Sequence, residues 1–179
     1  MNSSNTVKKL LGILILVCLS NIIIAQNLSN LDSKYGIKKF KLESSYDNYK
    51  SSLELELDGK VKYYKYVGSD IQSVFGQDIS KVILGFYKNK LYYVNLILDD
   101  SQPIYSDLVY DKLKQLFGST EKATTFNKGP LSYDWAYFWQ TKKTYLSFDK
   151  QLPNNQQAGR VTIWMISNVL DDQIAADDF

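Results

Sequence analysis

The sequence predicts an α+β domain, built from an antiparallel β-sheet with two helices packed on one of its faces. Apolar and polar residues alternate in three runs, at 53–66, 79–98 and 132–150, and each run contains a short polar turn, which is typical of β-hairpins. Two other stretches have apolar residues at three- and four-residue spacing, which favours helices. Runs of antiparallel strands separated by two helices indicate that both helices share one sheet face.

A secretory signal is indicated at the N-terminus. Two lysines precede an apolar run over 10–24, and Ala25 supplies the small residue that signal peptidase requires. We therefore expect cleavage between Ala25 and Gln26, which makes 1–25 a signal peptide and the protein secreted or periplasmic. Two alternatives stay open, a retained membrane anchor and acylation of Cys18. The apolar run is shorter than the roughly 20 residues that a spanning helix needs, and large apolar residues precede Cys18 where a lipoprotein has small ones.

Composition excludes several classes of function. The chain has 21 basic and 19 acidic residues, and loss of the signal removes Lys8 and Lys9, so the remaining domain is neutral. A neutral domain lacks the basic patch of a nucleic-acid-binding protein, and no membrane insertion is expected after cleavage. Histidine is absent and the single cysteine lies within the signal, which excludes Ser-His-Asp triads, cysteine nucleophiles and the usual zinc sites. We therefore expect no enzyme, no cofactor and no metal.

Cleavage leaves a length that is typical of one domain. Residues 26–35 are polar and are expected to form a flexible leader, and 36–167 are expected to form the single α+β domain. The acidic stretch 168–179 is expected to be a solvated, frayed tail.

The two predicted helices differ in strength. The first covers about 45–52, where Ser44 and Asp47 are spaced like a capping box. The second follows Pro103 and ends before Gly118, a favoured C-cap residue. Its apolar stripe consists of Tyr105, Leu108, Val109, Leu113, Leu116 and Phe117.

Turn residues set the expected register of each hairpin. The turns are expected at Asp58-Gly59, Asn89-Lys90 and Thr141-Lys142. A weaker strand is expected over 122–127 and a last strand over 160–167. The segments 85–96 and 137–148 align with matching aromatic residues, which favours a tandem helix-plus-strands repeat.

Two motifs together resemble a known family. A helix ending in Leu116-Phe117-Gly118 precedes a Trp-containing strand, Tyr133-Asp134-Trp135-Ala136-Tyr137. This order resembles the small exported domains of the SmpA/OmlA type, and it is similar to the related β-lactamase-inhibitor-like fold of tandem helix-plus-antiparallel-strand repeats. The resemblance covers roughly 36–167 and implies a domain that binds proteins without catalysis. The chain lacks the lipobox of those lipoproteins, which argues against a role in outer-membrane assembly.

The third hairpin has one expected core face and one expected solvated face. The core face carries Trp135, Tyr137, Trp139, Leu146 and Phe148. The solvated face carries Asp134, Ala136, Phe138, Gln140, Lys143, Tyr145 and Asp149. The Tyr and Trp residues of the first set could form a sugar-stacking platform, but the polar opposite face favours a core.

The second hairpin is apolar on both expected faces. One face carries Ile83, Tyr87, Tyr92, Val94, Leu96 and Leu98, and the other carries Val82, Leu84, Phe86, Tyr93 and Ile97. An antiparallel sheet normally exposes one face to water, so the second apolar face needs a cover. The leader, the C-terminal SNVLDDQIAA, a second copy of the chain or a partner could provide it.

We therefore predict a binding surface for a protein partner or a second copy, formed by Val82, Leu84, Phe86, Tyr93, Ile97, Phe138 and Tyr145. On this interpretation, Phe86→Lys abolishes association without unfolding the domain. One alternative is a carrier of a small apolar or carbohydrate ligand, held by Tyr and Trp in a pocket between sheet and helices. A second is a carboxylate-only glycosidase, which needs two acids flanking one bond, and Glu54 and Glu56 are better explained as the solvated side of a strand.

Overall fold

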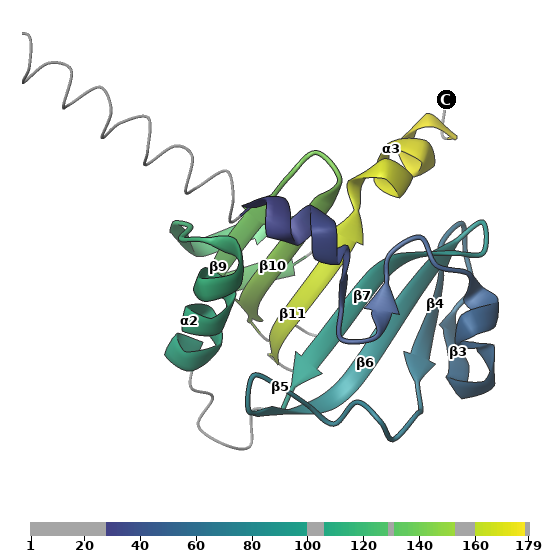
Figure 1. Cartoon of the computed structure of the whole chain (residues 1–179), viewed down its shortest axis with the longest axis horizontal. Coiled ribbons are helices and arrows are strands. Elements are labelled where there is room, and N and C mark those ends of the chain that lie inside the picture. The colour runs from purple at the N-terminus through teal and green to yellow at the C-terminus, as the bar shows by residue number, and fades with distance from the viewer. Residues whose placement is uncertain (1–27, 100–105, 129–130, 153–159, 178–179) are drawn as a thin grey trace, which may run out of the picture.

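The computed structural model describes residues 28–99, 106–128, 131–152 and 160–177 (Figure 1). The predicted signal peptide, its cleavage site at Ala25 and Gln26, and Pro103 lie outside these ranges. Within the described ranges, none of the helices has the length and apolar character needed to cross a membrane.

A large antiparallel sheet organises the molecule and confirms the α+β prediction. In chain order its strands are β3 (Leu53–Leu57), β4 (Lys62–Tyr66), β5 (Ser73–Val74), β6 (Gln77–Tyr87), β7 (Lys90–Leu98), β8 (Lys122–Lys128), β9 (Leu131–Gln140), β10 (Thr144–Gln151) and β11 (Arg160–Ser167). They lie side by side in the order β3-β4-β6-β7-β11-β10-β9-β8, and β5 pairs with β6 outside this path. A small separate sheet pairs β1 (Gly36–Ile37) with β2 (Phe40–Lys41).

The sheet consists of two four-strand meanders that meet at β7 and β11. Helical elements precede each meander, which agrees with the predicted tandem organisation. The equivalence of the strands differs from the predicted alignment, however. The meander order makes β6 and β7 correspond to β10 and β11, whereas the aligned segment 137–148 lies on β9 and β10.

The stronger predicted helix is confirmed and the weaker one takes a different form. Helix α2 (Ser106–Phe117) ends at Gly118, whose φ of 88° is the left-handed C-cap conformation. In place of a helix over 45–52, the chain forms two 3-10 turns, η1 (Tyr46–Asn48) and η2 (Lys50–Ser52). Ser45, rather than Ser44, accepts the capping bond, from the backbone N–H of Asp47 at 3.2 Å.

Two segments expected to be loose are helical instead. The expected leader contains a helix over 28–34, where Leu31 is fully buried and the hydroxyls of Thr141 and Thr144 donate to Asp32. The expected acidic tail contains α3 (Asn168–Ala176), which begins at the N-cap Ser167 and buries Leu170. Both helices form because a single buried leucine and a polar anchor tie each to the sheet.

The large sheet has a helix face and a far face. The helix 28–34, α2 and the small β1–β2 sheet lie in front of the large sheet in Figure 1, so this side is the helix face. It carries the hydrophobic core, whose strand residues include Val82, Leu84, Leu96, Trp139, Leu146 and Ile163. Side chains alternate between the two faces along each strand, so the residues between these lie on the far face.

The hairpin registers decide which side chains share a face. In the third hairpin, Trp139 pairs with Leu146 instead of Thr144, a shift of two residues that keeps both predicted faces. In the second hairpin the turn lies at Lys88-Asn89 instead of Asn89-Lys90, and Leu84 pairs with Val94. The new turn displaces the pairing by two near the turn, where Phe86 pairs with Leu91 instead of Tyr93. A register shift between Gly85 and Phe86 then leaves most of the hairpin displaced by one, which exchanges the partners of the two faces.

The first hairpin is also shifted by one residue. Leu55 pairs with Tyr64 instead of Tyr63, and the register shifts between Leu55 and Leu57. Opposite charges still face each other across this hairpin, but the pair is Glu54 and Lys65.

Candidate functional site: an aromatic row on the far face

An aromatic row crosses the far face of the large sheet. Its members are Tyr63 on β4, Tyr93 on β7, Trp164 on β11, Tyr145 on β10 and Phe138 on β9. In that order, neighbouring ring centroids are 5.8, 6.1, 5.1 and 5.7 Å apart, which is the range of favourable aromatic pairs. All five side chains are part-exposed. The row therefore presents aromatic area on the side of the sheet opposite to α2.

Gly85 on β6 keeps the row continuous. It lies between Tyr63 and Tyr93, which pair with it from the two neighbouring strands. A Cβ atom at this position would lie 2.9 Å from Tyr63 Cε1 and 3.0 Å from Tyr93 Cβ. These separations are shorter than packed side chains tolerate, so a larger residue would push the rings apart. Glycine at this position lets the two rings meet across β6.

A buried carboxylate lies beneath the row. Asp149 on β10 has no exposed surface. Its Oδ2 accepts hydrogen bonds from the Ser147 hydroxyl at 2.7 Å and from the Trp164 indole N–H at 2.6 Å. Its Oδ1 accepts from the Thr162 hydroxyl at 2.9 Å and from the Gln151 amide at 3.4 Å. Because the indole is one of the donors, Asp149 fixes the orientation of the central ring of the row.

Burial disfavours charge on the groups of the far face. It raises the pKa of Asp149 above its ordinary value, and its hydrogen bonds lower this pKa by less. Burial likewise raises the pKa values of Tyr93 and Tyr145, and the nearby Asp149 carboxyl raises both further. The phenols are therefore neutral hydrogen-bond donors and acceptors at physiological pH.

The seven residues predicted to form a binding surface are divided between the two faces. Tyr93, Ile97, Phe138 and Tyr145 lie on the far face, as the pairing of Ile97 with Thr162 and of Phe138 with Ser147 requires. Val82, Leu84 and Phe86 lie on the helix face and are 4%, 0% and 4% exposed. The prediction that these three residues lie on a surface is therefore wrong.

Phe86 is a core residue because 3-10 turns cover it. Its ring centroid lies 5.3 Å from that of Tyr46 and 6.2 Å from that of Tyr49. A lysine at this position would place a charge among aromatic rings without a partner. We therefore expect Phe86→Lys to unfold the domain, in contrast to the outcome predicted from the sequence.

The expected solvated face of the third hairpin is also corrected. Ala136, Ser147 and Asp149 on that face are fully buried. Large aromatic neighbours and the polar network around Asp149 account for this burial. Alternation alone predicted the side of the sheet correctly but not the degree of exposure.

Three important members of the site were not predicted. Trp164 and Tyr63 belong to strands that the sequence indicates, but only the strand order brings them beside Tyr93. Asp149 was assigned to solvent because a carboxylate normally is. One sequence signal could have identified this polar face. In the strand RVTIWMIS, Thr162 and Trp164 alternate with buried aliphatic residues and therefore share the face opposite to the core.

Other chemistry has little support among the described residues. No group of three or more acidic or cysteine side chains in these ranges is arranged to hold a metal ion. Glu54 and Glu56 are both exposed, and Glu56 forms a salt bridge of 2.6 Å with Lys81. A pocket does lie between the sheet and α2, but its lining is mainly aliphatic and contains no Tyr or Trp.

The aromatic row offers rings, neutral phenol groups and a fixed indole, which suit binding rather than bond breaking. No protein-family model matches this chain, and no curated protein or solved structure matches it either.

Proposed function

We propose that this protein is an exported, non-catalytic domain that binds another protein, or a second copy of itself, through the aromatic row. The observation that carries this proposal is the unbroken contact of five part-exposed rings on one face. Tyr and Trp dominate the residues that contribute most binding energy at protein interfaces. Their rings supply apolar contact area, and their polar tips supply hydrogen bonds.

The extent of the row favours a protein over a small ligand. It reaches from β4 to β9, across six neighbouring strands. At about 4.8 Å per strand, this is a length of roughly 24 Å. Small-molecule sites are enclosed and concave, whereas a long row of side chains on a sheet suits an extended contact.

The polar network below the row supports a rigid binding surface. Asp149 accepts a hydrogen bond from the Trp164 indole, and Gly85 leaves the space in which Tyr63 and Tyr93 make contact. Side chains that are already ordered lose less entropy when a partner binds. The exported location in this proposal rests on the apolar run before Ala25.

Site-directed photo-crosslinking tests the proposal. The photoreactive residue p-benzoylphenylalanine would replace Tyr63 or Tyr145 in the row, and Leu108 as a control, because Leu108 is 43% exposed on α2. After irradiation of the producing cells, we expect the same discrete protein adduct at both row positions and none at the control.

The opposite pattern would contradict the proposal. If neither row position gives an adduct, or if all three positions give the same one, the row is not a specific protein-binding surface. Adducts with carbohydrate alone would favour the ligand-carrier alternative.

A further inference from the structure

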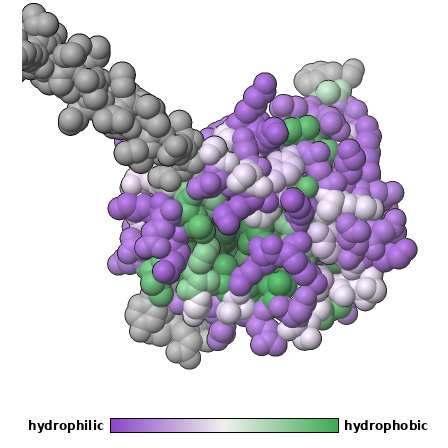
Figure 2. All heavy atoms as spheres, viewed as in Figure 1, coloured by the Kyte–Doolittle hydropathy of each residue, from purple (hydrophilic) through white to green (hydrophobic). Residues whose placement is uncertain are grey.

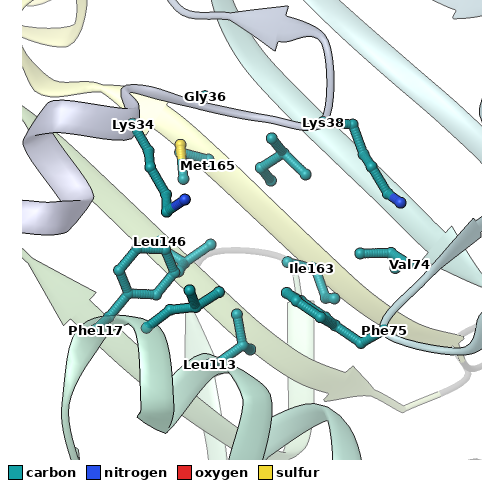
Figure 3. Close-up of a pocket in the computed structure, with 12 residues that line it drawn as sticks. Lys34, Gly36, Lys38, Val74, Phe75, Leu113, Phe117, Leu146, Ile163 and Met165 are labelled. Carbon is teal, nitrogen blue, oxygen red and sulfur yellow. The ribbon is translucent and has the colours of Figure 1, made fainter.

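A second feature lies on the helix face, on the opposite side of the sheet from the row. It is a pocket of about 230 Å³ between the 34–38 segment, the β5–β6 turn, α2 and the sheet (Figure 3). Its apolar walls are formed by Val74, Phe75, Leu113, Phe117, Leu146 and Ile163, among others. In Figure 2, apolar residues at the centre of this side are surrounded by hydrophilic ones.

Two lysines belong to the lining of this otherwise apolar pocket. Figure 3 shows the side chain of Lys34 extending toward Leu146 and that of Lys38 extending toward Val74. Neither ammonium group has a hydrogen-bond or ion-pair partner in the ranges that the structure describes. An apolar pocket bordered by two unpaired cations is complementary to a molecule with an apolar body and one anionic group.

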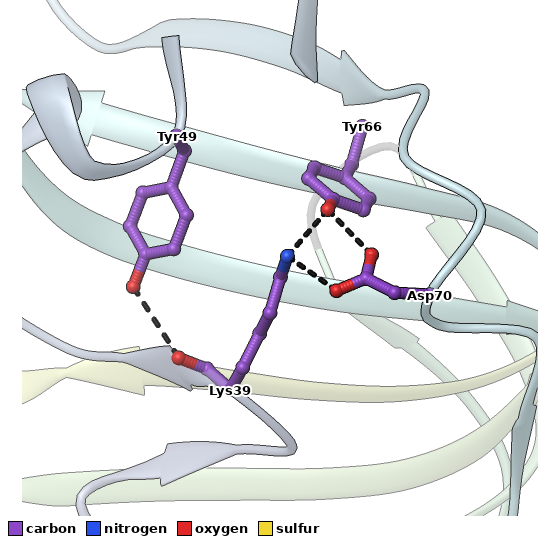
Figure 4. Close-up of polar contacts among 4 residues, drawn as sticks. All are labelled: Lys39, Tyr49, Tyr66 and Asp70. Atoms are coloured by element: carbon purple, nitrogen blue, oxygen red, sulfur yellow. Dashed lines mark hydrogen bonds and ion pairs between the residues drawn. The ribbon is translucent and has the colours of Figure 1, made fainter. Parts of the chain in front are cut away.

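The neighbouring Lys39 shows what a structural lysine looks like in this fold. Its Nζ lies 2.6 Å from Asp70 Oδ2 and 2.5 Å from the Tyr66 hydroxyl (Figure 4). Lys39 is not part of the pocket lining. Asp70 thus pairs with Lys39, whereas Lys38 has no such partner in the ranges that the structure describes.

Two residues that line the pocket, Lys38 and Phe75, have left-handed backbone conformations. Phe75 has a φ of 51° and Gly76 a φ of 82°, in a two-residue turn where Asn-Gly is strongly preferred. Lys38, in the turn between β1 and β2, has a φ of 55°. Left-handed conformations are rare for residues with large side chains, and they are concentrated where ligands are held. Here the strained turn places the Phe75 ring against the pocket (Figure 3).

We propose that this pocket binds an anionic amphiphile, a molecule with a single anionic headgroup and a short unbranched apolar chain, such as a short fatty acid. Lys34 and Lys38, which lie on opposite sides of the pocket in Figure 3, each offer an ammonium group with which the headgroup can pair. The chain lies against Leu113, Phe117 and Ile163, which are at most 5% exposed. This site is separate from the aromatic row, so either function can fail without the other.

Calorimetric titration with octanoate and with octan-1-ol tests the proposal directly, because the two probes share a chain and differ in charge. We expect octanoate to bind more tightly than octanol. Raising the salt concentration should weaken the binding of octanoate and leave that of octanol unchanged. The variant Lys34→Gln/Lys38→Gln should lose roughly tenfold in octanoate affinity. Lys112→Gln, an exposed residue of α2 outside the pocket, is the matched control and should bind like the wild type.

A second variant separates the turn from the lysines. Phe75→Asn gives the turn its preferred Asn-Gly sequence and removes a wall of the pocket. We expect this variant to unfold at a higher denaturant concentration and to bind both probes more weakly. Binding of neither probe, equal affinity for both, or an unchanged octanoate affinity in the double lysine variant would overturn the proposal.

Discussion

Asp149 illustrates how one residue shapes the far face. A carboxylate in this position is fully buried, yet four side-chain donors surround it. Removal of a polar group from such a network strongly destabilises the fold, because its donor partners are left without an acceptor. The same network orients Trp164, so it connects the stability of the fold with the geometry of the row.

We expect Asp149→Ala to destabilise the domain by about 2–4 kcal/mol, since several buried donors lose their acceptor. Asp134→Ala is a matched control on the neighbouring strand. Its carboxylate is 44% exposed and forms only a surface ion pair with Lys150, so a change within about 0.5 kcal/mol is expected. Urea unfolding of the three proteins measures both values. Equal stabilities of the two variants would contradict a structural role for Asp149.

Asp149 also predicts a pH dependence of stability. Burial raises the pKa of its carboxyl above the unfolded value of about 3.9. The folded state therefore binds this proton more tightly than the unfolded state does. The stability that protonation contributes is present below the unfolded pKa and is lost as pH rises through the raised folded pKa.

Urea unfolding between about pH 4 and pH 7 checks this sign. The free energy of unfolding of the wild type minus that of Asp149→Asn should fall as pH rises, because only the wild type has the titrating carboxyl group. A difference that grows with pH would mean that the four hydrogen bonds outweigh burial and that the pKa is lowered.

At the scale of elements, strand periodicity predicts which residues share a face only where the observed pairing differs from the predicted pairing by an even number of residues. The third hairpin is shifted by two residues from the predicted pairing, and Trp139 and Leu146 still share the core face. In the second, a register shift between Gly85 and Phe86 leaves most of the pairing displaced by one, so Leu84 lies with Val94 in the core and Tyr93 lies on the far face. The positive φ angles of Lys88 and Asn89 fix this turn, but neither residue is glycine, so the sequence carried little signal for it.

Gly85 gives an element-scale test of the row. Gly85→Ala should destabilise the sheet by about 1–2 kcal/mol, because the new methyl group meets Tyr63 and Tyr93 at 3.0 Å or less. Gly59→Ala is the control, since the nearest atom to its added Cβ is the Val61 carbonyl oxygen at 3.5 Å. Urea unfolding and the near-ultraviolet circular dichroism of the aromatic rings measure the effect. An unperturbed spectrum in Gly85→Ala would contradict close contact of the rings across β6.

At the scale of the whole molecule, the sequence predicted the class of fold and much of the strand inventory. It predicted β11 with its observed bounds and β8 within one residue. The sequence did not predict the order of strands in the sheet, because β7 and β11 are distant in sequence and their pairing depends on tertiary contacts. That pairing brings Tyr93 beside Trp164 and so completes the row. The sequence therefore indicated four of the far-face residues and could not assemble them into one site.

The two faces of the sheet give the molecule two separate surfaces. The helix face holds the core and the lysine-bordered pocket, and the far face holds the aromatic row. The central claim is that the row binds a protein. A variant of the row should therefore lose association and keep the fold.

Native mass spectrometry of the protein isolated from its producing cells tests this claim most directly. We would compare the wild type with Tyr63→Ser/Tyr145→Ser in the row and with Leu55→Ser/Leu108→Ser, which removes two exposed leucines outside the row, since Leu55 pairs with Tyr64 on the helix face. We expect the wild type and the leucine variant to carry a protein partner or a second copy, and the row variant to be a folded, lone chain. A lone wild-type chain, or a complex that survives in the row variant, would contradict the account.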